Sequence, residues 1–71
     1  MNTDYIGKIS KELEELSEKG VKLETFLSSD PQIDIRQINL LKLQHHFMKG
    51  YAEVLRQRLS LLKIQEVSHQ N

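Results

Sequence analysis

The chain has 71 residues and no cysteine, and its ten Lys and Arg side chains balance ten Asp and Glu side chains. A domain this small buries only about 60% of the surface of its unfolded chain, so natural examples usually add disulfides, a metal or partner subunits. The lack of cysteine excludes disulfides and fits a reducing compartment. The zero net charge argues against non-specific binding to nucleic acid, which needs a basic excess.

Targeting and membrane signals are absent from the sequence. No apolar run approaches the ~20 residues that a membrane-spanning helix needs. The first residues, MNTDYIGKISKE, lack the apolar stretch of a secretory signal peptide. We therefore expect residues 1–71 to form one soluble, intracellular helical domain.

Residues 4–28 carry apolar side chains at alternating intervals of three and four, the pattern of a helix with one buried seam. Thr3 or Asp4 can cap its start, and Lys and Glu side chains at i,i+4 mark the opposite face as solvated. Gly7 could introduce a kink that separates a short extra N-terminal helical segment. Gly20 lies in the seam, where glycine costs about 1 kcal/mol relative to alanine but permits close approach. The first-helix seam comprises Ile6, Ile9, Leu13, Leu16, Gly20, Leu23 and Leu27.

The stretch SSDPQID, residues 28–34, breaks the helical pattern. Pro31 disfavours helical geometry at Asp30. Asp34 with Gln37 resembles a capping box, and a start with Pro31 in the first turn is also compatible. A turn over about 29–34 is short enough to make the two helices antiparallel neighbours.

The second helix is predicted over about 35–65, with a frayed polar tail over 66–71. It carries two apolar seams, an arc wider than one partner helix can cover. We therefore predict an all-α antiparallel two-helix hairpin that oligomerises through its helix faces, with Phe47, Tyr51, Val54 and Leu61 at the interface. The hairpin seam comprises Ile38, Leu41, His45, Met48, Ala52, Leu55, Leu59 and Leu62. The second seam comprises Leu40, Gln44, Phe47, Tyr51, Val54, Arg58 and Leu61.

Catalytic and metal sites are not indicated. His45 and His46 are adjacent, so on a helix they point about 100° apart and cannot bind one metal together. No Ser or Thr has a recognisable base, and a helical hairpin offers little concavity, so we expect no enzyme. The helices are too long and too acidic for a DNA-binding helix-turn-helix.

Arg58 stands inside an otherwise apolar seam, and two interpretations stay open. Its methylenes could pack at the seam border while the guanidinium reaches water or a carboxylate. Alternatively, it could hold an anion between subunits, because the guanidinium fork matches phosphate geometry. A two-fold interface would present each cation and each tyrosine twice, matching the two phosphates and two bases of a cyclic dinucleotide. Tyr51 is assigned to the interface, whereas Tyr5 could join the core or stack on a base.

The two helices together show a family resemblance over residues 5–62. The first helix reads YIGKISKELEELSEKGVKLETFL, with the blocks Lys8-Ile9, Lys22-Leu23 and Phe26-Leu27. The second reads LLKLQHHFMKGYAEVLRQRL, with the blocks Val54-Leu55 and Arg58-Leu59. The sequence resembles a family of very short helical proteins of tailed bacteriophages that includes the anti-CBASS sponge proteins.

This resemblance implies a compact helical protomer that assembles, typically as a hexamer, in the cytoplasm of the infected host bacterium. It implies sequestration of cyclic di- or trinucleotide signals of host defence, with no chemistry and no cofactor. By position in the family blocks, Lys22 and Arg58 would neutralise phosphates. Lys8 would assist them, Tyr5 would stack on a base, and Thr25 is a candidate for a threonine that contacts the larger cyclic ligand.

Two alternatives remain beside this prediction. The chain could be an oligomeric adaptor whose second seam binds a host or phage protein, or it could sequester an ADP-ribose-type signal. The sequence leaves open which nucleotide is bound, how many subunits assemble, which tyrosine stacks and whether Gly7 breaks the first helix.

Overall fold

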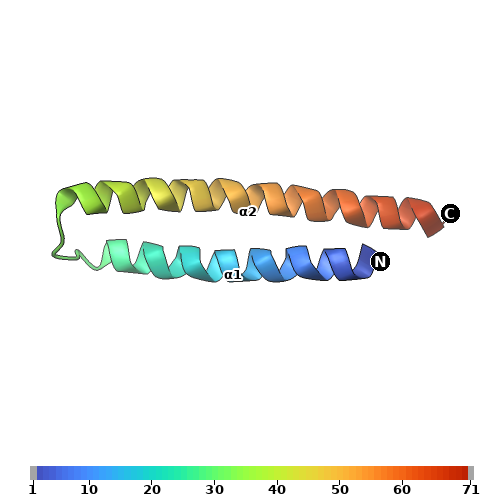
Figure 1. The fold of residues 1–71 in the computed structure, drawn as a ribbon, viewed down its shortest axis with the longest axis horizontal. Helices are drawn as coiled ribbons and strands as arrows, with labels where there is room; N and C mark the ends of the chain where they lie inside the picture. The colour runs from blue at the N-terminus through green and yellow to red at the C-terminus, as the bar shows by residue number, and fades with distance from the viewer. Residues whose placement is uncertain (1, 71) are drawn as a thin grey trace.

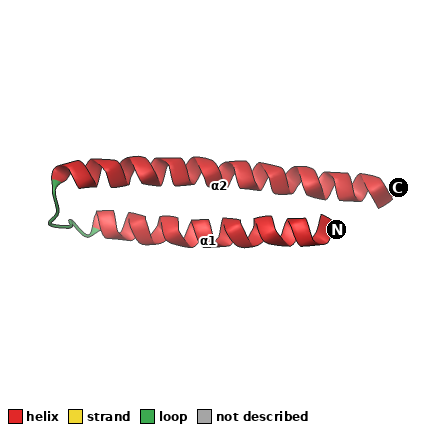
Figure 2. Cartoon of the chain, in the orientation of Figure 1, coloured by secondary structure: helices red, strands yellow, loops and turns green. Residues whose placement is uncertain are grey.

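In the computed structural model, two helices joined by a short loop run antiparallel along their whole shared length (Figures 1 and 2). Helix α1 covers Asn2–Ser28 and helix α2 covers Ile35–Gln70. The structure describes the backbone of residues 2–70 and the surroundings of side chains 4–64. The predicted all-α antiparallel hairpin is confirmed.

Helix α1 is continuous, so Gly7 neither breaks it nor separates an extra N-terminal segment. A Cβ atom added at Gly7 would meet nothing within 4 Å. At the other end of α1, the backbone N–H and the hydroxyl of Ser29 both donate to the Phe26 carbonyl, at 3.1 and 2.6 Å. Asp30 follows with a φ of 58°, in the left-handed region that Asp tolerates better than most residues. Pro31 comes next, so the helix cannot continue.

Asp34 caps the start of α2. Its carboxylate accepts a hydrogen bond from the Arg36 backbone N–H at 2.8 Å, and its carbonyl accepts from the N–H groups of Gln37 and Ile38. The carboxylate also pairs with the Arg36 guanidinium at 2.7 Å. The helix therefore starts after Asp34, not at Pro31. The Asp34 carboxylate accepts its hydrogen bond from the backbone N–H of Arg36, the second residue of the helix. Asp34 is therefore a simple N-cap, not part of the reciprocal capping box that its spacing to Gln37 indicated.

Helix α2 extends beyond its predicted end. The sequence predicted an end near residue 65 and a frayed tail over 66–71, whereas the backbone is helical to Gln70. No glycine or proline follows Gly50, so nothing in the sequence interrupts the i→i−4 hydrogen bonding of the backbone. Asn71 lies outside the described residues.

The core between the helices consists of the first-helix seam and the hairpin seam. Ile9, Ala52, Leu55 and Leu59 are buried, and Leu55 is fully enclosed. Every other residue of these two seams is half-buried, including Gly20 and His45. The buried cluster lies where the first half of α1 packs on the second half of α2, with Ile6, Leu13, Leu16 and Leu62 around it. Burial at this spacing confirms the helical faces that the heptad-like pattern predicted.

The hairpin is a thin rod of 57 × 15 × 14 Å. A single helix with its side chains is already about 10–12 Å across, so almost every residue of the chain lies near the surface. The accessible surface is 5841 Å², whereas a compact protein of 8.3 kDa would expose only about 4,600 Å². One hairpin therefore leaves on the order of 1,200 Å² more surface in water than a compact chain of its mass.

We predict that replacing Asp34 by Ala lowers the thermal unfolding midpoint, because the first turn of α2 loses its side-chain acceptor. Asp34→Asn should keep most of that stability at neutral pH, since Asn caps helices about as well as Asp. Circular dichroism melts of the three proteins check this, and equal midpoints for Asp34→Ala and wild type would contradict the cap.

The same residue predicts a pH dependence. Hydrogen bonds from the Arg36 side chain and then its backbone N–H lower the pKa of the Asp34 carboxyl below its ordinary value. A lowered folded-state pKa stabilises the native chain above the unfolded-state pKa, and the contribution is lost as pH falls through the folded-state pKa. The stability difference between wild type and Asp34→Ala should therefore shrink below about pH 4, as the Asp34 carboxylate becomes protonated. A difference that stays constant from pH 7 to pH 2 would contradict this assignment.

Candidate functional site

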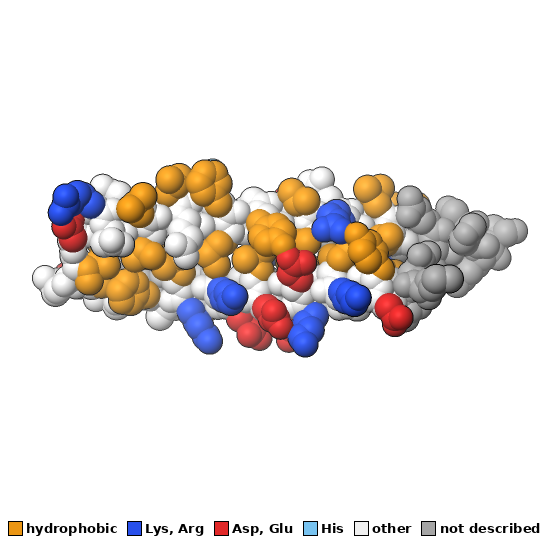
Figure 3. Space-filling view, in the orientation of Figure 1, with side chains coloured by type: hydrophobic (Ala, Val, Ile, Leu, Met, Phe, Trp, Pro, Cys, Tyr) orange, Lys and Arg blue, Asp and Glu red, His pale blue; other side chains and the backbone are white. Residues whose placement is uncertain are grey.

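A second apolar surface runs along α2 on the side that α1 leaves uncovered, and we call it the outer face. Apart from Gly50, which directly precedes Tyr51, its members repeat at intervals of three and four, and all are exposed. Phe47 is the extreme case, with 64% of its surface accessible. Figure 3 shows these apolar side chains along α2 beside charged side chains on α1. The outer face comprises Leu40, Leu43, Phe47, Gly50, Tyr51, Val54, Arg58 and Leu61.

The structure brings two of the predicted ligand-binding residues together. The Arg58 guanidinium donates a hydrogen bond to the Tyr5 hydroxyl, and its Cζ atom lies 5.7 Å from the centroid of the Tyr5 ring. Both side chains remain exposed. Arg58 thus reaches across the helix boundary and presents a cation beside an aromatic ring, at the edge of the outer face.

Tyr5 opens a stripe of α1 that borders the outer face, and we call it the lateral stripe. Its residues follow at intervals of three and four, so they share one side of the helix. Lys8 lies one turn from Tyr5 on this stripe, next to the Arg58 contact. The lateral stripe comprises Tyr5, Lys8, Glu12, Glu15, Lys19, Lys22 and Phe26.

Lys22 and Thr25 lie far from Arg58 within one chain. Because Tyr5 contacts Arg58, Lys22 is about 25 Å and Thr25 about 30 Å away along α1, at 1.5 Å per residue. Both side chains are exposed. A single hairpin therefore cannot bring Lys22 and Arg58 to one small anion.

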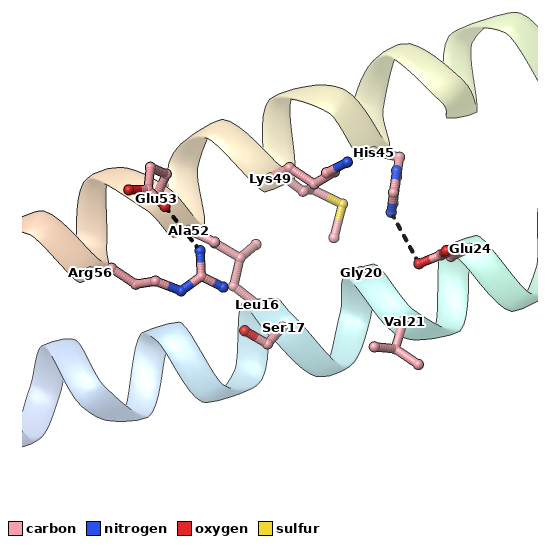
Figure 4. Close-up of a pocket in the computed structure, with 11 residues that line it drawn as sticks. Leu16, Ser17, Gly20, Val21, Glu24, His45, Lys49, Ala52, Glu53 and Arg56 are labelled. Carbon is pink, nitrogen blue, oxygen red and sulfur yellow. Dashed lines mark hydrogen bonds and ion pairs between the residues drawn. The ribbon is translucent and has the colours of Figure 1, made fainter.

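A groove of about 410 Å³ lies on another side of the hairpin, over Gly20 (Figure 4). Two of its cationic or titratable side chains already contact carboxylates: Arg56 contacts Glu53 at 3.4 Å, and the imidazole of His45 lies 3.9 Å from Glu24. Lys49 also lines the groove. The groove thus carries both signs of charge in contact, whereas among the described side chains Arg58 has no carboxylate within ion-pair distance. The Arg58 side of the molecule is therefore the better anion site.

His45 and His46 point to different sides of α2, as their adjacent positions in the sequence predicted. His45 is half-buried at the hairpin seam beside Glu24, while the exposed ring of His46 tilts against Phe47 with centroids 5.7 Å apart. Within the described residues, no three His, Asp or Glu side chains gather as a metal site would require. No helix in that part of the chain combines the length and apolar content needed to cross a membrane.

The structure adds residues that the sequence did not single out. A shallow recess of about 540 Å³ opens in the outer face next to Tyr51. Leu43 belongs to neither predicted seam, although its spacing of four to Phe47 and three to Leu40 signals a shared face. Phe26 belongs to one of the family blocks, and the structure leaves its ring exposed on the lateral stripe. The recess is lined by Leu40, Leu43, Gln44, Phe47, Met48 and Tyr51.

Comparison with known proteins identifies the family. The model of the Sequestin family matches residues 3–61, and the chain belongs to this family. The family name describes proteins that sequester another molecule, which agrees with the resemblance to sponge proteins. No curated protein and no solved structure matches the chain.

The exposed outer face predicts that copies of the chain assemble through it, because contiguous exposed apolar surfaces commonly mark interaction sites. We expect Phe47→Glu to lower the mass in solution at micromolar concentration and to lower the helical content with it, because Phe47 is 64% exposed in one hairpin and a separated hairpin leaves its outer face in water. Sedimentation velocity with circular dichroism measures both quantities.

Ser60→Glu is the matched control. Ser60 is exposed and lies about 200° around α2 from Arg58, off the outer face. The control should leave the mass unchanged. Equal masses for wild type and Phe47→Glu would show that the outer face does not mediate assembly.

Proposed function

We propose that this chain sequesters a nucleotide signal of host anti-phage defence and holds it without chemical change, so that the host effector does not receive it. Cyclic di- and trinucleotides of CBASS defence are the first ligand class. Membership in the Sequestin family supports the sequestering role. The function needs a ligand site and an assembly that forms it, and it takes place in the cytoplasm of the infected bacterium.

The Tyr5–Arg58 contact carries the proposal. A guanidinium binds phosphate through paired hydrogen bonds, and an aromatic ring stacks on any nucleobase, a contribution of about 1–3 kcal/mol per base. Both groups are exposed and already lie side by side. The only partner of Arg58 among the described side chains is a neutral hydroxyl, so a phosphate can replace it without separating an ion pair.

Lys8 adds a second cation one helical turn from Tyr5, and Glu12 lies a further turn along α1. Tight binding without reaction needs hydrogen bonds and stacking but no general base beside the phosphate. Asp4, the chain neighbour of Tyr5, and Glu12, one turn beyond Lys8, are the nearby carboxylates along α1, and both are exposed. This composition suits a binding site rather than a hydrolytic one.

The residues that one chain gathers around the Tyr5–Arg58 contact favour a second ligand class, ADP-ribose-type signals. Each chain supplies one ring, one guanidinium and one neighbouring lysine at this point, and Lys22 is about 25 Å away. A ligand with one base and two adjacent phosphates could therefore bind the ring and the two cations of a single chain. A cyclic dinucleotide, with two bases and two separated phosphates, needs the same set from two chains.

Calorimetric stoichiometry separates the two classes. Titration of the assembled protein with cyclic dinucleotides, cyclic trinucleotides and cyclic ADP-ribose isomers should give binding by at least one of them. A dinucleotide that uses two clusters binds once per two chains, whereas an ADP-ribose-type ligand binds once per chain. If the folded, assembled protein retains none of these ligands, the proposed function is wrong, and the adaptor alternative takes its place.

We predict that Arg58→Ala weakens retention of the bound nucleotide about 10- to 100-fold, because hydrogen bonds to charged groups contribute about 1.5–3 kcal/mol. Arg56→Ala is the matched control, since Arg56 is an exposed neighbour already paired with Glu53. Equilibrium dialysis against labelled ligand measures the effect. Equal losses in the two variants would remove Arg58 from the site, and loss of assembly in Arg58→Ala would indicate the adaptor alternative.

A further inference from the structure

A row of cations follows α2 on the side opposite the outer face. Its members recur every seven residues, a step that falls only about 20° short of two full turns, so they share one side of the helix over about 30 Å. Phe47 of the outer face and Lys49 of the row flank Met48 of the hairpin seam, about 100° to either side. All four cations are exposed. We call this the basic row, and it comprises Lys42, Lys49, Arg56 and Lys63.

The basic row forms one wall of the groove over Gly20. Lys49 and Arg56 line the groove from α2, and Ser17 and Val21 line it from α1 (Figure 4). Val21 is 62% exposed, so part of the apolar lining stands in water. The groove thus combines a cationic wall with an apolar floor. The apolar side chains of this floor are Leu16, Val21, Met48 and Ala52.

Two small residues keep this groove open. A Cβ atom added at Gly20 would meet nothing within 4 Å, so packing inside the hairpin does not require glycine there, where alanine is the better helix former. Ala52, on the α2 side of the groove, carries only a methyl group. Small side chains at a contact between helices let their backbones approach closely. Both residues therefore suit a third helix packed against α1 and α2.

The spacing of the cations indicates the form of the partner. Helices packed side by side present charged residues to each other at seven-residue intervals, beside the apolar residues of the contact. The basic row has this period, and Glu53 is the only carboxylate of α2 among residues 35–64. A helix that carries carboxylates at the same period would meet one cation about every 10 Å.

A nucleic-acid backbone fits this side of the hairpin less well. Its phosphates follow one another without a gap, whereas Glu24 and Glu53 stand among the cations of the groove and would repel them. A helix can place a neutral side chain opposite each of these carboxylates. The apolar floor also favours an apolar stripe of side chains, as in other complexes of a helix with a groove.

We infer that the groove over Gly20 docks an acidic amphipathic helix of a partner protein. The helix lies along the hairpin as a third rod, with its apolar stripe in the groove and its carboxylates against the basic row. This protein-docking site goes beyond the proposed nucleotide binding and does not depend on it, since the Tyr5–Arg58 contact lies at the edge of the outer face.

A designed peptide tests the site. The probe is a helix-forming peptide of about 21 residues, the length of the basic row, with leucine and alanine in one stripe and glutamate beside it at every seventh position. The comparison peptide has the same composition in scrambled order. Fluorescence anisotropy with the wild-type protein should show that the probe binds, more weakly as salt rises, and that the scrambled peptide does not. Equal behaviour of the two peptides overturns the inference.

Removal of two cations from the basic row tests its contribution. The double variant Lys42→Ala, Lys49→Ala should bind the probe about threefold to tenfold more weakly, because two exposed ion pairs with the probe are lost. Neither lysine has a carboxylate within ion-pair distance among the described side chains, so the hairpin itself loses no ion pair.

The matched control is Lys11→Ala, Lys19→Ala. Both lysines are exposed on α1 and neither lines the groove. This control should bind the probe as the wild type does, with circular dichroism recorded to show that all three proteins are folded. Equal losses in the two double variants would overturn the role of the basic row.

Gly20→Ala separates docking from stability. The substitution should raise the thermal unfolding midpoint, since alanine favours the helix. It should also weaken binding of the probe, because the added methyl group enters the groove. Probe binding that stays unchanged or strengthens would contradict a helix seated over Gly20.

Two further measurements test other occupants of the groove. Duplex DNA of about 20 base pairs that binds more tightly than the probe at the same salt would make the basic row a nucleic-acid surface and overturn the inference. A lower mass in solution for Lys42→Ala, Lys49→Ala than for wild type would show that a second copy fills the groove, which also overturns it. Nucleotide retention should be unchanged in this variant, so failure of the proposed function leaves the docking test standing.

Discussion

Two helices that meet along one seam can bury only the side chains of that seam, and this limit governs the rest of the molecule. The seam between α1 and α2 encloses Leu55 and a few neighbours, which leaves a second apolar surface along α2 in water. Burial of apolar area contributes about 25 cal/mol per Å². A few hundred Å² of outer face covered by another chain therefore gives a gross gain of several kcal/mol, from which the cost of association is subtracted. Under the proposed assembly, contact between copies would be part of how this sequence becomes stable.

The same limit explains where a small ligand can bind. The grooves that the described part of this two-helix rod offers are shallow, so a closed site needs walls from more than one copy. In the groove over Gly20, Glu24 and Glu53 already contact His45 and Arg56. At Tyr5 and Arg58, by contrast, a cation and a ring stand exposed beside the surface through which copies would meet. Stability and ligand binding thus depend on one face, so binding would strengthen assembly and assembly would strengthen binding.

The helical faces could be predicted from the sequence because burial follows the spacing of apolar residues. Every residue assigned to the hairpin seam is at least half-buried, and Arg58 stood out because it interrupts the second seam. Other features depend on the relative position of the helices, which spacing alone does not give. The contact of Arg58 with Tyr5 depends on how far the loop shifts one helix along the other. The large distance between Lys22 and Arg58 has the same cause. The family pattern places both residues at a phosphate site, but a pattern in the sequence gives no distance between the two helices. The continuity of α1 through Gly7 reflects packing of neighbours such as Ile6 and Ile9, which outweighs the low helical propensity of glycine.

The mass of the wild-type protein in solution tests this account most directly. Sedimentation equilibrium from low to high micromolar concentration, with helical content recorded on the same samples, shows whether folding and assembly occur together. The account predicts a well-folded species whose mass is a multiple of 8.3 kDa and which loses helical structure as dilution separates its copies. A single chain of 8.3 kDa that stays fully helical throughout dilution would contradict it.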